Sequence, residues 1–554
     1  MTERDQSLTR SAVLPGERRE LFARVAQLWR RAARYLQPDQ RVDALRSVLH
    51  PGRPARTARE AAVVAVECVA HPLYFSLFAA ICEDMREVAP IRVELVVTRS
   101  INAAVGTALA QVIARSAWVG RLVSRNWIRA FRGIADGVAY RSQSLSHPLG
   151  DLIDWWRSRA LARQARDSAT FADLQIDGVQ VGDLIIDSYV RFRPRANFQP
   201  HDAFTRLLIW QACRDVRRAN AYFGKRRPLL YLTSYSAYIQ HGIPVRVALM
   251  HGVAVISFGS LARFAKQLSQ ADWYHTPDTR DYKARFDSLD RQGERLSQAE
   301  QQLNTRFLGG IDPVTSYMRV SAYRRTAEAV PPVAGATVVF LHDFYDSLHV
   351  YPDVVFHDFW QWACCTIDVL KASGQRFFVK PHPNQIMRSG AALADLRQKY
   401  PDLPLISSTI TNSQLAQAGM ACGVTMYGSV AHELAYFGVP SIACARHPHN
   451  AFDFCRTART LAEYEQYLRA AGETLIDKAE MRRQALIFYY MHNLHGSAAE
   501  LALRQQYVDF WKASIAESTP GEVREIFATL RSGDAFRRLG AALRSGAIPE
   551  QQFG

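Results

Sequence analysis

The chain has 554 residues, with 68 Lys and Arg against 52 Asp and Glu, a formal net charge of +16, and 48% hydrophobic residues. A chain this apolar can bury large cores, which excludes a disordered or low-complexity protein, and its length predicts two to four domains. The excess of positive charge favours an anionic partner: nucleic acid, a phosphorylated metabolite or the acidic surface of a membrane.

Cysteine usage and the N-terminal sequence predict a cytoplasmic protein. The eight cysteines lie in apolar runs without a C-x-x-C pair, so we expect buried thiols and no disulfide framework. The first 20 residues carry charges of both signs and no apolar core, so we expect no secretion signal. Residues 61–82 are strongly apolar, but Glu67, His71 and Pro72 make a membrane span costly. We expect two buried helices there, meeting at His71 and Pro72.

The first part of the chain divides into a helical section and an α/β domain. Arginines alternate with Leu, Val and Ala at helical spacing, which predicts a basic helical N-terminal section over residues 1–90. From residue 91, short β-branched runs alternate with longer helical stretches, as in βαβ units around a parallel sheet. This N-terminal domain is expected over residues 91–330, with strands at 92–98, 228–233 and 253–258.

A second α/β alternation comes after Pro331, Pro332 and Gly335, which interrupt regular structure. It predicts a C-terminal domain over residues 331–480, followed by helices and a basic tail over 481–554. Strands are expected at 337–341, 376–380, 405–407, 423–427 and 440–444, and helices at 356–372 and 430–437. We therefore predict an α/β protein with two Rossmann-like, doubly wound domains that face a cleft, the GT-B arrangement, although other paired α/β proteins share this pattern. Ligands collect where the carboxyl ends of such strands meet the cleft.

An apolar run ends in Lys380-Pro381-His382-Pro383. The two prolines stiffen the exit from the strand and hold an ammonium and an imidazole at its carboxyl end, where a phosphate can bind. The alternative is an ordinary proline-rich turn with an exposed histidine. The position at the end of a strand favours the ligand site.

Gly428 and Ser429 begin a helix directly after another apolar strand. Free backbone N–H groups and the positive end of the helix dipole would face the cleft there and favour a phosphate or diphosphate. His432 and Glu433 come next, within the first turn; both are assigned to the nucleotide site, Glu433 as a ligand of ribose hydroxyls. The alternative is a plain helix start with a surface glutamate.

Three further segments carry candidate groups. His342 and Asp343 follow the first strand of the C-terminal domain, where they can contact donor phosphate or acceptor, or form only a hydrogen-bonded turn. Residues 182–191 contain Asp187 among apolar positions. Residues 234–242 offer hydroxyls and rings that suit a sugar, although a polar turn followed by an amphipathic helix is an equal alternative.

Several catalytic motifs are absent from the sequence. It contains no D-x-D, H-E-x-x-H, G-x-S-x-G or G-x-x-x-x-G-K-[ST] motif, which counts against metal-bridged transfer, zinc hydrolysis, serine hydrolysis and P-loop ATPase activity. We therefore expect neither a metal site nor a bound cofactor. Neutralisation of a leaving phosphate would fall to Lys380, His382 and backbone amides.

The segments KPHP (380–383) and YGSVAHELAYFGVP (427–440) resemble the C-terminal donor domain of GT-B enzymes of bacterial surface-polysaccharide assembly. That group includes capsule-type Kdo transferases, bacterial sialyltransferases and CDP-glycerol glycerophosphotransferases. The resemblance implies that His382 and Ser429 hold a nucleotide phosphate. An Asp/Glu-Asp/Glu-Gly motif, which carries the acceptor-side base in the sialyltransferase-like pattern, is absent. Three further segments also resemble proteins of capsule and O-antigen gene clusters: residues 182–191, 237–249 and 340–349.

These observations predict a metal-independent glycosyltransferase that moves a sugar from a nucleotide donor to a lipid-linked, capsule, O-antigen or other cell-surface glycan. The resemblance implies a CMP-linked acid sugar such as Kdo. Asp187 is the expected acceptor-side base, with Asp343 as its substitute, and His342 and Asp343 line the cleft. The donor is held by Lys380, His382, Gly428, Ser429, His432 and Glu433.

Two alternatives remain at the level of sequence. One is a glycerophosphotransferase or sugar-nucleotide epimerase, since both suit two α/β halves. The other is a basic protein that binds nucleic acid or an anionic membrane, although no nucleic-acid motif supports it and no nucleic-acid partner is expected. Basic helices can also hold an enzyme at the inner face of the cytoplasmic membrane, close to a lipid-linked acceptor.

Overall fold

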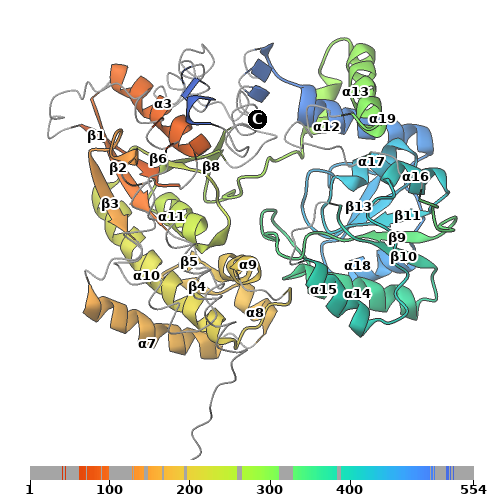
Figure 1. Cartoon of the computed structure of the whole chain (residues 1–554), viewed down its shortest axis with the longest axis horizontal. Helices are drawn as coiled ribbons and strands as arrows, with labels where there is room; N and C mark the ends of the chain where they lie inside the picture. Colours follow the sequence, from red (N-terminus) through yellow and green to blue (C-terminus); the bar gives the residue numbers. More distant parts are fainter. Residues whose placement is uncertain are drawn as a thin grey trace, which may run out of the picture.

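The computed structural model in Figure 1 describes most of residues 61–98, 128–258, 265–310 and 328–498, with short gaps, and a few single residues elsewhere. Most of the basic helical section predicted over residues 1–90, and most of the predicted tail, lie outside the described residues. Within the described part, two groups of strands and helices form the two halves of the molecule.

The N-terminal half is built on a six-stranded sheet of order β3-β2-β1-β6-β7-β8. All neighbouring strands are parallel except β7 and β8, which are antiparallel. Central strands of a parallel sheet are covered on both faces, which explains their unbroken apolar sequences. The strands are β1 (Ala62–Glu67), β2 (Ile91–Val97), β3 (Gly137–Arg141), β6 (Leu230–Thr233), β7 (Ala254–Ser257) and β8 (Lys266–Leu268).

Strand β1 corrects the sequence analysis. The prediction of two helices over residues 61–82 is wrong in its first part, because Ala62–Glu67 forms a strand between β2 and β6. A buried strand and a buried helix both appear as continuous apolar runs, so periodicity does not separate them. Only the second part is helical: Pro72 begins α3 (Pro72–Val88), at a position where proline is well tolerated. The N-terminal sheet thus includes residues before the expected domain limit at 91.

Five helices and a short hairpin complete the described N-terminal half. Helix α10 lies between α11 and α7, and α7 runs along the outer side of the molecule (Figure 1). Asp202 caps the start of α10 by accepting the N–H of Phe204, and Arg227 ends it in a left-handed conformation. The helices are α7 (Pro148–Gln164), α8 (Ser168–Ala172), α9 (Gly182–Phe192), α10 (Ala203–Arg226) and α11 (Tyr238–Met250); the hairpin is β4 (Gln175–Ile176) and β5 (Val179–Gln180).

The C-terminal half is built on a five-stranded parallel sheet of order β10-β9-β11-β12-β13. Four of its five predicted strands are confirmed to within a few residues, whereas 405–407 makes only a single bridge between Leu405 and Val379. The elements are β9 (Thr337–Phe340), α14 (Phe359–Ala372), β10 (Phe377–Lys380), α15 (Ser389–Lys399), α16 (Asn412–Gln417), β11 (Cys422–Val424), α17 (Val430–Tyr436), β12 (Ser441–Ala443), β13 (Cys455–Thr457) and α18 (Leu461–Arg469).

Helices from two distant parts of the sequence form one apolar cluster beside α17. They are α12 (Tyr282–Asp287) and α13 (Gln292–Phe307), which precede the second sheet, and α19 (Lys478–Tyr489), which continues as the π-helical turn η1 (Tyr490–Leu494). The two sheets, which are parallel apart from the edge strand β8, confirm together with their helices the predicted α/β class and the GT-B arrangement of two Rossmann-like domains. No helix in the described part of the chain is long and apolar enough to cross a membrane.

Candidate functional site

The candidate site lies at the carboxyl ends of β9, β10 and β11. These strands are adjacent and parallel, with Val339 paired to Val379 on one side and to Val424 on the other. The residues after these strands therefore leave the sheet at the same edge. This register brings the segments that contain His342, His382 and Gly428 together.

His342 stands at the centre of these segments. Its Nε2 atom lies 3.0 Å from the hydroxyl of Thr425, which also accepts the backbone N–H of Gly428 at 3.0 Å. The ring stacks on Phe359, with 4.9 Å between centroids. Burial, together with the nearby charge of His382, lowers the pKa of His342 to about 3. The imidazole is therefore neutral at physiological pH and is held in one orientation.

Gly428 and Ser429 form the beginning of α17 beside His342. A Cβ atom at residue 428 would lie 2.8 Å from the Thr425 hydroxyl, so a larger residue would displace the hydroxyl that bonds His342. Ser429 is exposed, and its side chain makes no hydrogen bond that caps the helix. Four predicted site residues therefore share this region, namely His342, His382, Gly428 and Ser429.

Lys380 and Glu433 point into the protein instead. The Lys380 ammonium donates to Asn412 Oδ1 at 2.9 Å, and Asn412 Nδ2 donates to Glu433 at 2.9 Å. The other partners of Glu433 are Arg306, at 3.1 Å, and the hydroxyl of Tyr323. Burial lowers the pKa of Lys380 to about 8, against the opposing effect of Glu433. We call these five residues the Glu433 cluster; it lies in the interior, with Glu433 only 4% exposed.

His432 lies in a row of three buried imidazoles. Its Nδ1 atom is 3.1 Å from His449 Nε2, and His449 Nδ1 is 3.0 Å from His447 Nδ1. Phe488 packs on the His432 ring, with centroids 5.0 Å apart. His432 therefore faces the interior and not the exposed surface beside Ser429. Among the described residues, no group of three or more His, Cys, Asp or Glu is arranged to hold a metal ion.

Acid should destabilise the protein through its buried histidines. Burial lowers the pKa of five of them, to about 3 for three. Histidines of the unfolded chain have a pKa near 6.5, so the contribution of these residues to the free energy of unfolding is complete above about pH 6.5. It is lost as the pH falls below that value, by up to about 1.4 kcal/mol per pH unit for each histidine. Urea unfolding from pH 7.5 to 5 measures this slope; a constant free energy of unfolding would contradict it. The residues are His275, His342, His432, His447 and His449.

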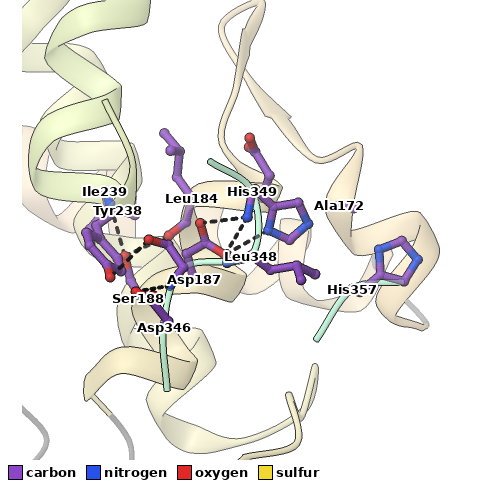
Figure 2. Close-up of polar contacts among 12 residues, drawn as sticks. Ala172, Leu184, Asp187, Ser188, Tyr238, Ile239, Asp346, Leu348, His349 and His357 are labelled. Atoms are coloured by element: carbon purple, nitrogen blue, oxygen red, sulfur yellow. Dashed lines mark hydrogen bonds and ion pairs between the residues drawn. The ribbon is translucent and has the colours of Figure 1, made fainter. Parts of the chain in front are cut away.

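Asp187, the expected base, lies in the contact between the two halves (Figure 2). It is on α9, is 1% exposed, and accepts the backbone N–H groups of Leu348, at 3.1 Å, and His349, at 3.3 Å. The His349 imidazole lies 2.8 Å from the same carboxylate. Burial alone would lower the pKa of His349, but Asp187 raises it above its ordinary value. Asp187 therefore holds the segment after β9 against α9 and is closed to an acceptor in this arrangement.

Asp343, the expected substitute base, stabilises a local turn. Its carboxylate accepts the backbone N–H of Tyr345 at 3.0 Å and the hydroxyl of Ser389 at 2.8 Å. Asp343 is partly exposed and is the residue directly after His342, so it lies next to the four residues that the structure brings together.

A second pair of groups, missed by the sequence analysis, lies at the carboxyl edge of the N-terminal sheet. Glu67 ends β1, and His241 lies in the first turn of α11, where its Nδ1 atom binds Glu67 Oε1. Glu67 Oε2 accepts the backbone N–H and the hydroxyl of Ser234, both at 2.7 Å, and the hydroxyl of Thr233 at 3.0 Å. Burial by itself would raise the pKa of Glu67, but the contacts with His241 and Ser234 hold it below its ordinary value.

His241 differs from the buried histidines because its side chain is 19% exposed. Glu67 is 1% exposed, so its buried carboxylate holds the His241 ring by Nδ1, and Nε2 takes no part in that contact. The same arrangement orients catalytic histidines in many enzymes. The sequence signal was a glutamate at the end of an apolar run, which indicates a strand-end carboxylate only once residues 62–67 are recognised as a strand.

Aromatic residues connect this pair to the His342 region. The Tyr235 ring lies 6.1 Å from both His241 and Tyr238. Ser347 of the C-terminal half donates its hydroxyl to Tyr238, at 3.1 Å, and its carbonyl accepts the hydroxyl of Tyr427, at 2.9 Å. The Tyr427 ring then lies 4.7 Å from His342. The carboxyl edges of the two sheets therefore meet across the boundary between the halves.

The boundary also contains a hollow with residues of both halves, and a strained residue. Tyr238 begins α11 with φ at 61°, a left-handed conformation that is costly for a bulky side chain. Such strain persists only where surrounding contacts hold it, here including the Ser347 hydroxyl. The hollow is lined by groups that include Lys266, Asp272 and Tyr274 from one half and Tyr351, Arg446 and His447 from the other.

Comparison with known proteins finds similarity to solved structures alone. No protein-family model and no curated protein sequence matches the chain. KpsC of Thermosulfurimonas dismutans, a beta Kdo 2,4 transferase, is 12% identical over 46% of this chain and 76% of its own, with a TM-score of 0.25. A putative UDP-N-acetylglucosamine 2-epimerase of Listeria monocytogenes is 9% identical over 89% and 98%, with a TM-score of 0.22. The glycotransferase of kitacinnamycin is 12% identical over 89% and 97%, with a TM-score of 0.19. Each resembles this chain in fold alone.

Proposed function

We propose that the protein is a glycosyltransferase that needs no metal and moves a sugar from a nucleotide donor to a hydroxyl of a cell-surface or lipid-linked glycan. One observation carries the proposal. The carboxyl edges of the two sheets meet, which places the oriented imidazole of His241 on one side of the boundary and the segments around His342 on the other. A CMP-linked acid sugar such as Kdo, and a capsule or O-antigen acceptor, are the specific substrates we propose.

The donor phosphate would bind at the segments after β9, β10 and β11. Ser429 offers an exposed hydroxyl, and His382 offers a partly exposed imidazole, at the edge where Gly428 allows close approach of the backbone. His342 would position this surface through Thr425, because its own ring is neutral and stacked on Phe359. Lys380 would support this surface from the protein interior, through its hydrogen bond to Asn412.

His241 would act as the acceptor-side base, in place of Asp187. Glu67 holds Nδ1, so Nε2 can accept the proton of an acceptor hydroxyl that attacks the anomeric carbon. The carbon–oxygen bond to the donor phosphate breaks as the new glycosidic bond forms, and the nucleotide leaves as an anion. Alignment of both substrates between the halves, with water excluded, lowers the barrier.

Donor binding is expected to raise the melting temperature. A nucleotide sugar that binds the folded form alone stabilises it by about 2.7 kcal/mol at roughly 100 times its Kd. CMP-, CDP- and UDP-linked donors should be compared by thermal shift, followed by assay of nucleotide release with and without a glycan acceptor. Acceptor-dependent release supports transfer. Interconversion of the donor without release would indicate an epimerase, and release with glycerophosphate transfer would indicate a glycerophosphotransferase.

The donor site itself is tested by His382→Ala and Ser429→Ala. Ser429 is exposed and His382 partly exposed, so each change should have only a small effect on the melting temperature of the free protein. Both should reduce the shift produced by the donor, whereas His201→Ala, at an exposed histidine of the other half, should leave the shift unchanged. A donor shift that survives both substitutions would remove this assignment.

A further inference from the structure

The N-terminal part of helix α7 carries polar residues inward and apolar residues outward. Asp151, Asp154 and Ser158 are buried, at 7%, 3% and 3% exposure, whereas Leu149 is 77% and Trp156 is 62% exposed. A helix on the surface of a globular protein normally has the opposite arrangement. The outward side chains of α7 therefore need an explanation outside the described fold.

Ion pairs to α10 fix this orientation. Arg217 donates to Asp151 at 2.7 Å and to Asp154 at 2.8 Å, and Arg214 donates to Asp151 at 3.1 Å. The Trp210 indole also donates to the backbone carbonyl of Asp151, at 3.0 Å. Rotation of α7 to bury its leucines would break these bonds and leave buried arginines without their carboxylates, which is strongly unfavourable.

The outward residues form one continuous stripe. Their spacing of three and four residues places them on one face of the helix, and Trp155 extends the stripe at its side, with its ring 4.9 Å from that of Trp156. The guanidinium of Arg159 lies 4.5 Å above the Trp155 ring. Tryptophan and arginine together are typical of helices that lie at a membrane–water interface. The stripe consists of Leu149, Leu152, Ile153 and Trp156.

A basic pocket lies beside the N-terminal end of this helix. His147, which immediately precedes α7, is one of its lining residues, and Arg217 links it to Asp151 and Asp154. Asp151 also lies 3.2 Å from Arg218, and Glu94 lies 3.5 Å from Arg226, so these carboxylates offset part of the positive charge of the pocket. The pocket is also partly apolar, with Val138 and Ala139 in its wall. Its cationic residues are Arg141, Arg217, Arg218, Lys225 and Arg226.

We propose that α7 and this pocket dock the protein on an anionic lipid bilayer. The stripe would enter the boundary between headgroups and acyl chains, and the pocket would bind headgroup phosphates. An apolar stripe next to clustered cations matches a surface that is apolar inside and negatively charged outside. Helix α7 lies on the outer side of the N-terminal half, along α10 and away from the C-terminal half, so docking would leave the boundary between the halves open (Figure 1).

The test is co-sedimentation of the full chain with vesicles of phosphatidylcholine containing phosphatidylglycerol, and with vesicles of phosphatidylcholine alone. We expect binding to the anionic vesicles that weakens as salt is added. The triple variant Leu149→Ser, Ile153→Ser and Trp156→Ser should bind at least about tenfold more weakly, because burial of each apolar side chain contributes to partition. Lys225→Glu should reduce binding to the anionic vesicles.

Leu308→Ser is the matched control, because Leu308 is 85% exposed and lies outside α7; it should bind as the unaltered protein does. Equal binding to both kinds of vesicle, or full binding of the triple variant, would overturn the proposal. So would a triple variant with a clearly lowered melting temperature, since the stripe would then be covered by another part of this chain. Loss of a dimer in the triple variant, measured by light scattering without vesicles, would assign the stripe to a second copy instead.

Discussion

Replacement of His241 by glutamine is expected to lower turnover by about 10²–10⁴-fold, with the fold preserved. Glutamine can still donate a hydrogen bond to Glu67 but cannot take the proton of an acceptor hydroxyl. Glu67 also keeps its three other hydrogen bonds from Ser234 and Thr233, so the buried carboxylate stays satisfied. Transfer should therefore fall at saturating donor, while the thermal shift produced by the donor and the melting temperature stay unchanged.

The pH profile separates a base from a merely structural histidine. A histidine base must be neutral to act, so kcat/KM of the unaltered enzyme should fall at acid pH, and the residual activity of His241→Gln should lose that dependence. Glu67→Gln should lower kcat and displace the profile, because Glu67 positions the imidazole without contact with substrate. His251→Ala is the control: His251 lies beyond the other end of α11 and pairs with Asn220 at 3.0 Å. Full turnover in His241→Gln would refute the assignment.

Replacement of Glu433 by alanine is expected to destabilise the protein by roughly 3–5 kcal/mol. Glu433 and Arg306 are both nearly inaccessible, and the change would leave the Arg306 charge, the Tyr323 hydroxyl and the Asn412 amide without their shared acceptor. Urea denaturation measures the loss. Glu294→Ala removes an exposed glutamate paired with Arg291 at 3.8 Å on the surface of α13, and should change stability by no more than about 0.5 kcal/mol.

A double-substitution cycle tests whether the cost arises from the ion pair. Arg306→Met alone should also destabilise, and Arg306→Met with Glu433→Leu should cost less than the sum of the single changes, because neither charge of this ion pair is then left buried without the other. A different result would restore the role predicted from sequence: if Glu433→Ala leaves stability unchanged but weakens donor binding, Glu433 contacts the nucleotide.

The sequence predicted best where local pattern and sheet geometry agree. Apolar runs ended by Lys380-Pro381 and by Gly428 indicated strand ends, and in the structure the loops after these strands leave one edge of one sheet. In the structure, His342 lies beside Thr425, close to the second of these strand ends. The directions of the side chains were not predictable, because the order of residues does not show which side of a strand or helix will be covered by the rest of the protein. Lys380 and Glu433 therefore belong to the interior and not to the exposed surface beside Ser429.

By itself, the sequence determined the class of fold: β-branched runs separated by helical stretches require parallel strands with crossover helices, and the prolines at 331 and 332 separate two such sets. Tertiary structure alone decided that residues 62–67 form a strand, since only pairing with β2 and β6 distinguishes that apolar run from a helix. It also decided the partners of the chemically active groups. Glu67 meets His241 across 174 positions and Asp187 meets His349 across 162, and such contacts depend on strand order and on how two halves pack, which no local pattern encodes.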